Sequence, residues 1–138
     1  MDENVRARLC AIFATRGFDK TMAGLELLEA DGGRCKLRIT VDEGVQNLFG
    51  SLHGGAIATI VDDAGTMAIM SGDRDGRPGV TTDLNVTYVA AAKAGEVVLV
   101  EANVLKTGRT MAFVAVDLRR ERDGALVAQG RMTKFLST

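Results

Sequence analysis

Residues 47–70 carry most of the side chains that could do chemistry. The stretch reads NLFGSLHGGAIATIVDDAGTMAIM and holds the chain's only histidine, His53, and later two adjacent aspartates, Asp62 and Asp63. The spacing of its apolar residues predicts a helix from Gly54 to Ser71. A charged group is costly in apolar surroundings unless it is paired or solvated. The two carboxylates therefore call for an explanation.

The polar residues of this predicted helix form one stripe, at the i, i+3, i+4, i+7 spacing of a helix face: Thr59, Asp62, Asp63 and Thr66. One interpretation is a face turned to solvent. However, such faces usually carry long Lys, Glu or Arg side chains, and these are all short. The short side chains of the stripe suit a narrow crevice or an interface better.

The helix begins after His53-Gly54-Gly55, where the first backbone N–H groups have no partner within the helix. These N–H groups and the helix dipole favour an anion, and glycine lets a substrate approach the backbone. The arrangement is that of an oxyanion hole. The alternative is an ordinary glycine-bearing loop, with His53 holding the turn by hydrogen bonds.

The spacing of Gly54 and Asp62 adds a geometric condition. They are eight residues apart, which is ~12 Å along a helix at 1.5 Å per residue. One substrate carbonyl cannot touch both. If the two serve one reaction, the carboxylate must come from a second copy of the chain, and a two-fold dimer would then hold two equivalent composite sites. Thr66 would lie in or beside such a site.

The rest of the chain predicts the elements around this helix. Val5, Leu9, Ile12, Phe13 and Arg16 share one face of a short N-terminal helix that ends at Gly17. Alternating apolar residues and glycine-bearing turns predict six strands, at residues 25–30, 34–41, 80–88, 96–105, 110–119 and 125–135. Turns this short join antiparallel neighbours. We therefore expect one α+β domain spanning residues 1–138.

The composition narrows the function classes. The 138 residues hold 17 basic and 18 acidic side chains, with 46% hydrophobic residues, which gives no positive field for nucleic acid. No apolar run reaches the ~20 residues of a membrane span, and no secretory signal is evident. Cys10 and Cys35 lack metal-ligand spacing, and we expect both to be small core residues. These features favour an intracellular, cytoplasmic protein, with mitochondrial association left open.

The pattern N-x-x-G-x-x-H-G-G, followed by an acidic residue nine positions after the histidine, resembles the hotdog-fold thioesterases of the phenylacetate-degradation and 4-hydroxybenzoyl-CoA type. The segments GSLHGG, TMA, PGV, DLNVTY, AKAGE, VLKTGRT, VDL and AQGR extend the resemblance over most of the chain. It implies a hotdog fold, in which a curved antiparallel sheet of about six strands wraps a long central helix. It also implies a homodimer that pairs into a homotetramer, with active sites across the dimer interface.

The resemblance also implies roles for single residues. Asp62 matches the carboxylate that activates or orients water, or that attacks the thioester itself. Gly54 matches the backbone N–H that polarises the carbonyl. His53 would fix that loop and Asn47 would position water and substrate. Thr81 stands where a close family member has a water-assisting serine. Asp63 replaces an asparagine, and we interpret it as supporting.

Segments of the family that hold coenzyme A match two loops here, although Ala91 replaces the usual proline. No glycine-rich phosphate loop is present, so isolated cations at loop edges would meet the coenzyme A phosphates. For any one cation, an ordinary solubilising role is the alternative. The matched residues are Tyr88, Lys93, Lys106, Gly108, Arg109 and Thr110.

The expected reaction is hydrolysis of a medium- or long-chain fatty acyl-CoA, or an aryl-CoA, to the free acid and coenzyme A. No metal or cofactor is required, because coenzyme A is part of the substrate. Met67, Ile69 and Met70 could line the acyl site or could be plain core. The alternatives are a hotdog hydratase or dehydratase that acts on acyl thioesters, and an acyl-CoA-binding protein without turnover.

Overall fold

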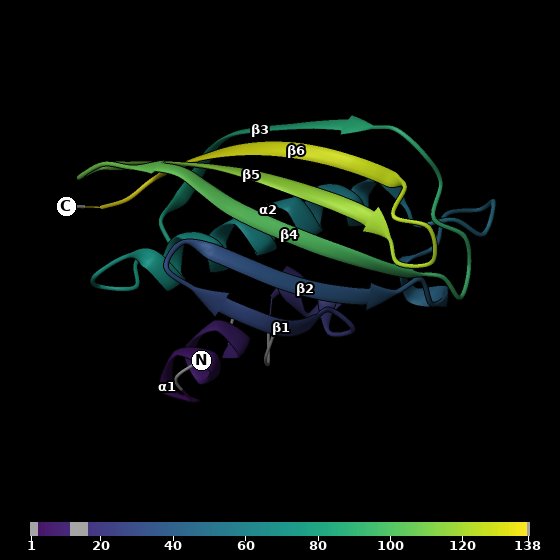
Figure 1. Ribbon diagram of the computed structural model, residues 1–138, viewed down its shortest axis with the longest axis horizontal. Helices are drawn as coiled ribbons and strands as arrows, with labels where there is room; N and C mark the ends of the chain where they lie inside the picture. Colours follow the sequence, from purple (N-terminus) through teal and green to yellow (C-terminus); the bar gives the residue numbers. More distant parts are fainter. Residues whose placement is uncertain (1–2, 12–16, 138) are drawn as a thin grey trace.

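The long helix α2 (Gly54–Gly72) lies across one face of a six-stranded antiparallel sheet in the computed structural model, which describes residues 3–11 and 17–137 (Figure 1). The strand order is β1-β2-β4-β5-β6-β3, so β1 and β3 are the edges. This is the expected hotdog arrangement. The strands are β1 (Glu26–Asp31), β2 (Arg34–Thr40), β3 (Val80–Tyr88), β4 (Val97–Thr107), β5 (Met111–Arg120) and β6 (Leu126–Phe135).

All six predicted strands are present, with ends within two residues of the expected ones. The turn between β1 and β2 contains Gly32 and Gly33, whose φ angles of 56° and 90° lie in the region that favours glycine. The hairpins β4–β5 and β5–β6 pair antiparallel as their short turns predicted. Local turn chemistry was therefore a sufficient guide to these three hairpins, whereas the pairings of β2 with β4 and of β3 with β6 join strands that are distant in the chain.

The N-terminal region differs from the expectation. Helix α1 covers Glu3–Cys10 and buries Leu9, whereas residues 12–16 of the predicted helix, with Ile12, Phe13 and Arg16, lie outside the described residues. Cys35 is a core residue as expected, but the expectation for Cys10 is wrong, because it is exposed at the end of α1.

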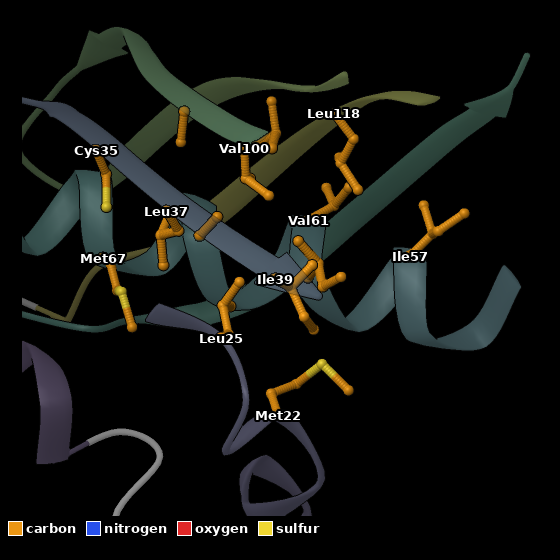
Figure 2. Close-up of a cluster of buried hydrophobic side chains, with 14 of the residues drawn as sticks. Met22, Leu25, Cys35, Leu37, Ile39, Ile57, Val61, Met67, Val100 and Leu118 are labelled. Carbon is orange, nitrogen blue, oxygen red and sulfur yellow. The ribbon is translucent and has the colours of Figure 1, made fainter. Parts of the chain in front are cut away.

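Two short 3-10 helices, η2 (Phe18–Met22) and η3 (Glu43–Val45), were not predicted. A helix this short has too few residues to show an apolar period. Met22 nevertheless anchors η2, because its side chain is buried and points toward the core beside Ile39 (Figure 2). None of the described helices is long and apolar enough to cross a membrane.

The core fills the space between α2 and the sheet. Its alternating sheet residues include Leu37, Val100 and Leu118, which Figure 2 shows pointing toward Val61 and Met67 of the helix. Burying an aliphatic side chain of this size stabilises the fold by about 1.5–3 kcal/mol. Met67 and Ile69 are therefore core residues, and Met70 packs against the core.

Two glycines let α2 approach the sheet closely. A Cβ on Gly65 would lie 2.5 Å from Cε of Met132, and one on Gly130 would lie 2.6 Å from Cγ1 of Val61. Since real contacts of this kind stay above about 3 Å, any larger residue would push the helix away. Close packing here brings the polar stripe of α2 against β3 and β6.

Candidate active site

His53 is the N-cap residue of α2. Its Nδ1 accepts a hydrogen bond from the Gly55 N–H at 2.8 Å, and its carbonyl accepts one from Ile57 at 2.9 Å. Within residues 3–11 and 17–137, no acceptor takes the N–H of Gly54. The hydroxyl of Tyr88 donates to the Gly54 carbonyl at 3.0 Å. One backbone donor is thus left available at the positive end of the helix.

Asn47 organises the loop that precedes the helix. Its Oδ1 accepts hydrogen bonds from the N–H groups of Phe49, at 2.9 Å, and Ser51, at 3.1 Å. Its side-chain oxygen is therefore already used within the loop, as in an Asx turn. The side-chain amide of Asn47 is the part that could still meet a water or a substrate.

Asp62 lies on the side of α2 that faces β3. The Thr81 hydroxyl donates a hydrogen bond to Oδ1 of Asp62 at 2.7 Å. Thr81 lies where the pairing of β3 with β6 shifts register, between Thr81 and Asp83. The Asp62 side chain is half-buried. A half-buried carboxylate that holds one hydrogen bond and still reaches the surface can act as a base or a nucleophile.

A buried lysine that sequence reasoning missed lies behind Asp62. Lys134 of β6 stands opposite Thr81 in the sheet, and only 6% of its surface is exposed. Its Nζ donates to Oγ1 of Thr66 at 2.6 Å, and Thr66 donates to the Asp62 carbonyl at 2.8 Å. Burial lowers the pKa of Lys134, while the carboxylates of Asp62, Asp63 and Asp19 oppose that shift. The alternation along β6 places Lys134 on the same inward face as Gly130 and Met132, and this is the signal that could have identified it.

Asp63, next along the helix, points to the other side of α2. It is 5% exposed, and among the described residues no hydrogen-bond donor reaches its buried Oδ2. Burial, reinforced by Asp19 and Asp62 and opposed by Lys134, raises the pKa of Asp63 to about 8. The polar stripe is therefore no solvated face. Asp19 was missed because nothing local links it to Asp63, 44 residues later.

Gly54 and Asp62 stay apart within one chain. An unbroken helix joins them, so the ~12 Å separation expected from helix geometry holds. His53 and Tyr88 lie at Gly54, Asn47 lines a cavity with His53, and Thr81 accompanies Asp62. The structure thus presents two half-sites on one helix.

The residues expected to hold coenzyme A also fall into two groups. Tyr88 lies at the start of α2, and Lys93 pairs with Ser51 of the preceding loop. The β4–β5 turn lies at the other end of the sheet, where the Arg109 carbonyl accepts a hydrogen bond from Arg77 after α2 (Figure 1). A 19-residue helix is about 28 Å long. This second group consists of Lys106 near the end of β4 and of Gly108, Arg109 and Thr110 in the turn.

A mainly apolar cavity of about 260 Å³ opens between η2, η3 and the first turns of α2. Phe18 and Met22 line it from η2, and Gly55 and Thr59 line it from α2. It lies next to His53. An apolar group attached to a carbonyl near the helix start could enter it.

Comparison with known proteins places this geometry in a family. The family model "Thioesterase superfamily" matches residues 49–127, which include Gly54, Asp62 and Thr81. The mouse protein acyl-coenzyme A thioesterase 13 is 42% identical over 99% of this chain and 96% of its own length. This chain belongs to the thioesterase superfamily. The human protein of the same name is 41% identical over the same shares of the two chains.

Solved structures of this superfamily agree with the fold. Zebrafish thioesterase superfamily member 2 is 46% identical, covers 98% of this chain and 97% of its own, and superposes with a TM-score of 0.92. The mouse protein of that name is 40% identical, covers 98% and 96%, and has a TM-score of 0.88. The Escherichia coli PaaI protein from the phenylacetic acid degradation operon, 18% identical, shares the fold with a TM-score of 0.84 over 99% and 95% of the two chains. The family resemblance is confirmed.

Proposed function

We propose that this thioesterase hydrolyses acyl-CoA to the free acid and coenzyme A at a site shared between two copies of the chain. The observation that carries the proposal is that one helix holds two complementary groups. The Gly54 N–H is a backbone donor without an acceptor among the described residues, and Asp62 is a carboxylate held by the Thr81 hydroxyl. The names of the mouse and human relatives support acyl-CoA as the substrate class.

The chemistry follows from these two groups. Asp62 takes a proton from water as the water oxygen bonds to the thioester carbon, and the carbonyl electrons move onto the oxygen held by Gly54. The intermediate then collapses, the C–S bond breaks, and the coenzyme A thiolate leaves and is protonated. A general base contributes ~10²–10⁴-fold and one oxyanion donor ~10²–10³-fold. Direct attack by Asp62, through an anhydride that water then opens, is the alternative route.

Two copies are needed because one helix cannot bring its own Gly54 and Asp62 to the same carbonyl. The edge strand β3 is open to a neighbour, and exposed apolar side chains lie on it and on the loop before α2: Val80, Leu84, Tyr88, Leu48 and Phe49. A two-fold axis that crosses this edge at right angles to β3 would place Gly54 of each copy near Asp62 of the other. Further pairing into a tetramer would let the distant β4–β5 turn reach the same coenzyme A.

The hydratase alternative is less well supported. Such chemistry needs a histidine free to move a proton, whereas Nδ1 of His53 is engaged as the cap of α2. An acyl-CoA-binding protein without turnover would not need the hydrogen bond from Thr81 that restricts the orientation of the Asp62 carboxylate. Both alternatives predict no thiol release from a saturated acyl-CoA.

The direct test is release of free thiol from acyl-CoAs of graded chain length and from an aryl-CoA. We expect hydrolysis by the wild type and a loss of at least 10²-fold in kcat for Asp62→Asn. Asp75→Asn, an exposed carboxylate in the loop after α2, is the matched control. An Asp62→Asn variant as active as the wild type would overturn the assignment. Crotonyl-CoA hydration would instead support the hydratase.

A further inference from the structure

The cavity at the start of α2 offers few free polar groups, although several polar side chains line it. The hydroxyl of Thr59 donates to the Gly55 carbonyl, and that of Thr21 donates to a carbonyl of η2, each at 2.8 Å. The side-chain amide of Gln46 donates to the Val41 carbonyl at 3.2 Å. No carboxylate, lysine or arginine among the described residues lines the cavity. An apolar group can therefore enter it without leaving these donors unpaired.

The inner wall of this cavity is apolar and buried. Met22 and Val45, from the two 3-10 helices, and Ala56, from α2, are 3%, 7% and 9% exposed. Phe18 also lines the cavity, but it is 70% exposed and so marks the side that opens to solvent. Methionine is flexible and adapts to the shape of its neighbours. This wall suits an apolar guest that enters from solvent past an aromatic ring.

The cavity adjoins the backbone donor assigned to the thioester. Gly55, the neighbour of Gly54, lines it, and His53 lines both this cavity and a larger one of about 580 Å³. The larger cavity is bounded by polar side chains that include Glu43 and Asn47. An acyl-CoA has the same division, because its carbonyl joins an apolar acyl group to the polar, amide-bearing arm of coenzyme A.

We propose that the apolar cavity of about 260 Å³ is the acyl site, and that it accepts an uncharged acyl group of up to about ten carbons. The limit follows from size, because an apolar cavity of ~150 Å³ holds benzene, a six-carbon ring. The inference rests on the proposed function, since it names the acyl groups that the site at Gly54 takes. An acyl group that ends in a carboxylate is rejected, because its charge would be buried without a partner.

The first experiment measures kcat/KM for a series of straight-chain acyl-CoAs from butyryl-CoA to palmitoyl-CoA. Each methylene that enters the cavity should raise kcat/KM by up to about fourfold, whereas those beyond about the tenth carbon should add nothing. A dicarboxylic acyl-CoA of medium length should be at least ~100-fold poorer than its monocarboxylic counterpart. Values of kcat/KM that rise steadily to palmitoyl-CoA, or that do not depend on chain length, would overturn the proposal.

Two variants test where the acyl group lies. Thr59→Phe fills the cavity from α2 and should lower kcat/KM for decanoyl-CoA about tenfold more than for butyryl-CoA. Phe18→Ala changes an exposed side chain, so the core stays intact, and it should lower the same ratio about threefold through lost apolar contact. Thr133→Phe, on the outer face of β6, is the matched control and should keep the wild-type ratio. If neither cavity variant changes the ratio, the acyl group lies elsewhere.

A binding measurement separates this inference from the proposed function. S-alkyl-CoA thioethers cannot be hydrolysed, so calorimetric titration with the butyl, octyl, decyl and hexadecyl forms reports affinity alone. The affinity of the wild type should rise with chain length up to about ten carbons, and Thr59→Phe should remove most of that rise. This result without thiol release from any acyl-CoA would defeat the proposed function and leave the acyl site standing. Thiol release with an affinity that does not depend on chain length would defeat the acyl site alone.

Discussion

Thr81 and Asp62 are joined by a 2.7 Å hydrogen bond between an edge strand and the central helix. They are 19 residues apart in the chain, and Thr81 stands opposite the buried Lys134 in the sheet. The hydroxyl donates to one oxygen of the carboxylate and leaves the other to act. This bond restricts the orientation of the carboxylate that the proposed function assigns to the reaction.

The first prediction concerns that bond. Thr81→Val removes the hydroxyl but keeps the branched shape, so Asp62 should lose its orientation. A hydrogen bond to a charged group contributes about 1.5–3 kcal/mol, which corresponds to a fall of roughly 10–100-fold in kcat/KM. Thr81→Ser keeps the donor and should retain most activity. Equal rates for the valine and serine variants would show that the hydroxyl has no role.

The second prediction tests the Gly54 N–H. Proline is tolerated at the first helical position and has no N–H, and His53 already has the extended φ and ψ, −63° and 136°, that precede proline. Gly54→Pro should therefore fold and lose ~10²–10³-fold in kcat. Gly54→Ala is the matched control, because its Cβ meets Tyr88 at an ordinary 3.4 Å and its N–H remains. Should both variants lose activity equally, crowding rather than the donor would be the cause.

The third prediction tests whether the site is shared. Gly54→Pro and Asp62→Asn damage different half-sites, so a mixed dimer would hold one site with both lesions and one intact site. Random re-pairing of equal amounts gives half mixed dimers, and thus about a quarter of wild-type activity. The measurement is thiol release after the two inactive proteins are unfolded and refolded together. Continued inactivity of a mixture whose mixed dimers are verified by tagged pull-down would argue for a site within one chain.

The fourth prediction concerns stability. Because the pKa of Asp63 is raised from 3.8 to about 8, the folded state holds its proton more tightly than the unfolded state. Its stabilising contribution is fully present below about pH 4 and is lost progressively as pH rises toward 8. Asp63→Asn avoids this loss. The free energy of unfolding of this variant should exceed that of the wild type by a few kcal/mol at pH 8, at about 1.4 kcal/mol per pKa unit as an upper limit.

Urea denaturation at pH 5 and pH 8 measures this difference. The advantage of Asp63→Asn should widen between the two pH values, with unchanged m-values. A constant advantage would mean that Asp63 binds the same number of protons in the folded and unfolded states, so that folding does not raise its pKa. The exposed Asp75→Asn serves again as control and should show no pH-dependent difference of this size.

The apolar period of residues 54–71, the alternation along the strands and the glycine turns are local properties, and they sufficed to predict α2 and all six strands. The eight-residue spacing of Gly54 and Asp62 required only helix geometry. Even the division into two half-sites could be derived from the sequence. These predictions were possible because each depends only on residues that are close together in the sequence.

The tertiary structure alone decided what surrounds the two aspartates. Lys134 is 72 residues from Asp62, and Asp19 is 44 residues from Asp63. The alternation along β6 places Lys134 on the buried face, but no periodicity along β6 or η2 shows which groups Lys134 and Asp19 approach. The distances between these charged groups depend on how closely α2 packs on the sheet at Gly65 and Gly130. Because electrostatic energy depends on distance and burial rather than on chain order, only the folded chain makes Asp62 the half-buried carboxylate and Asp63 the buried one, whose pKa is raised.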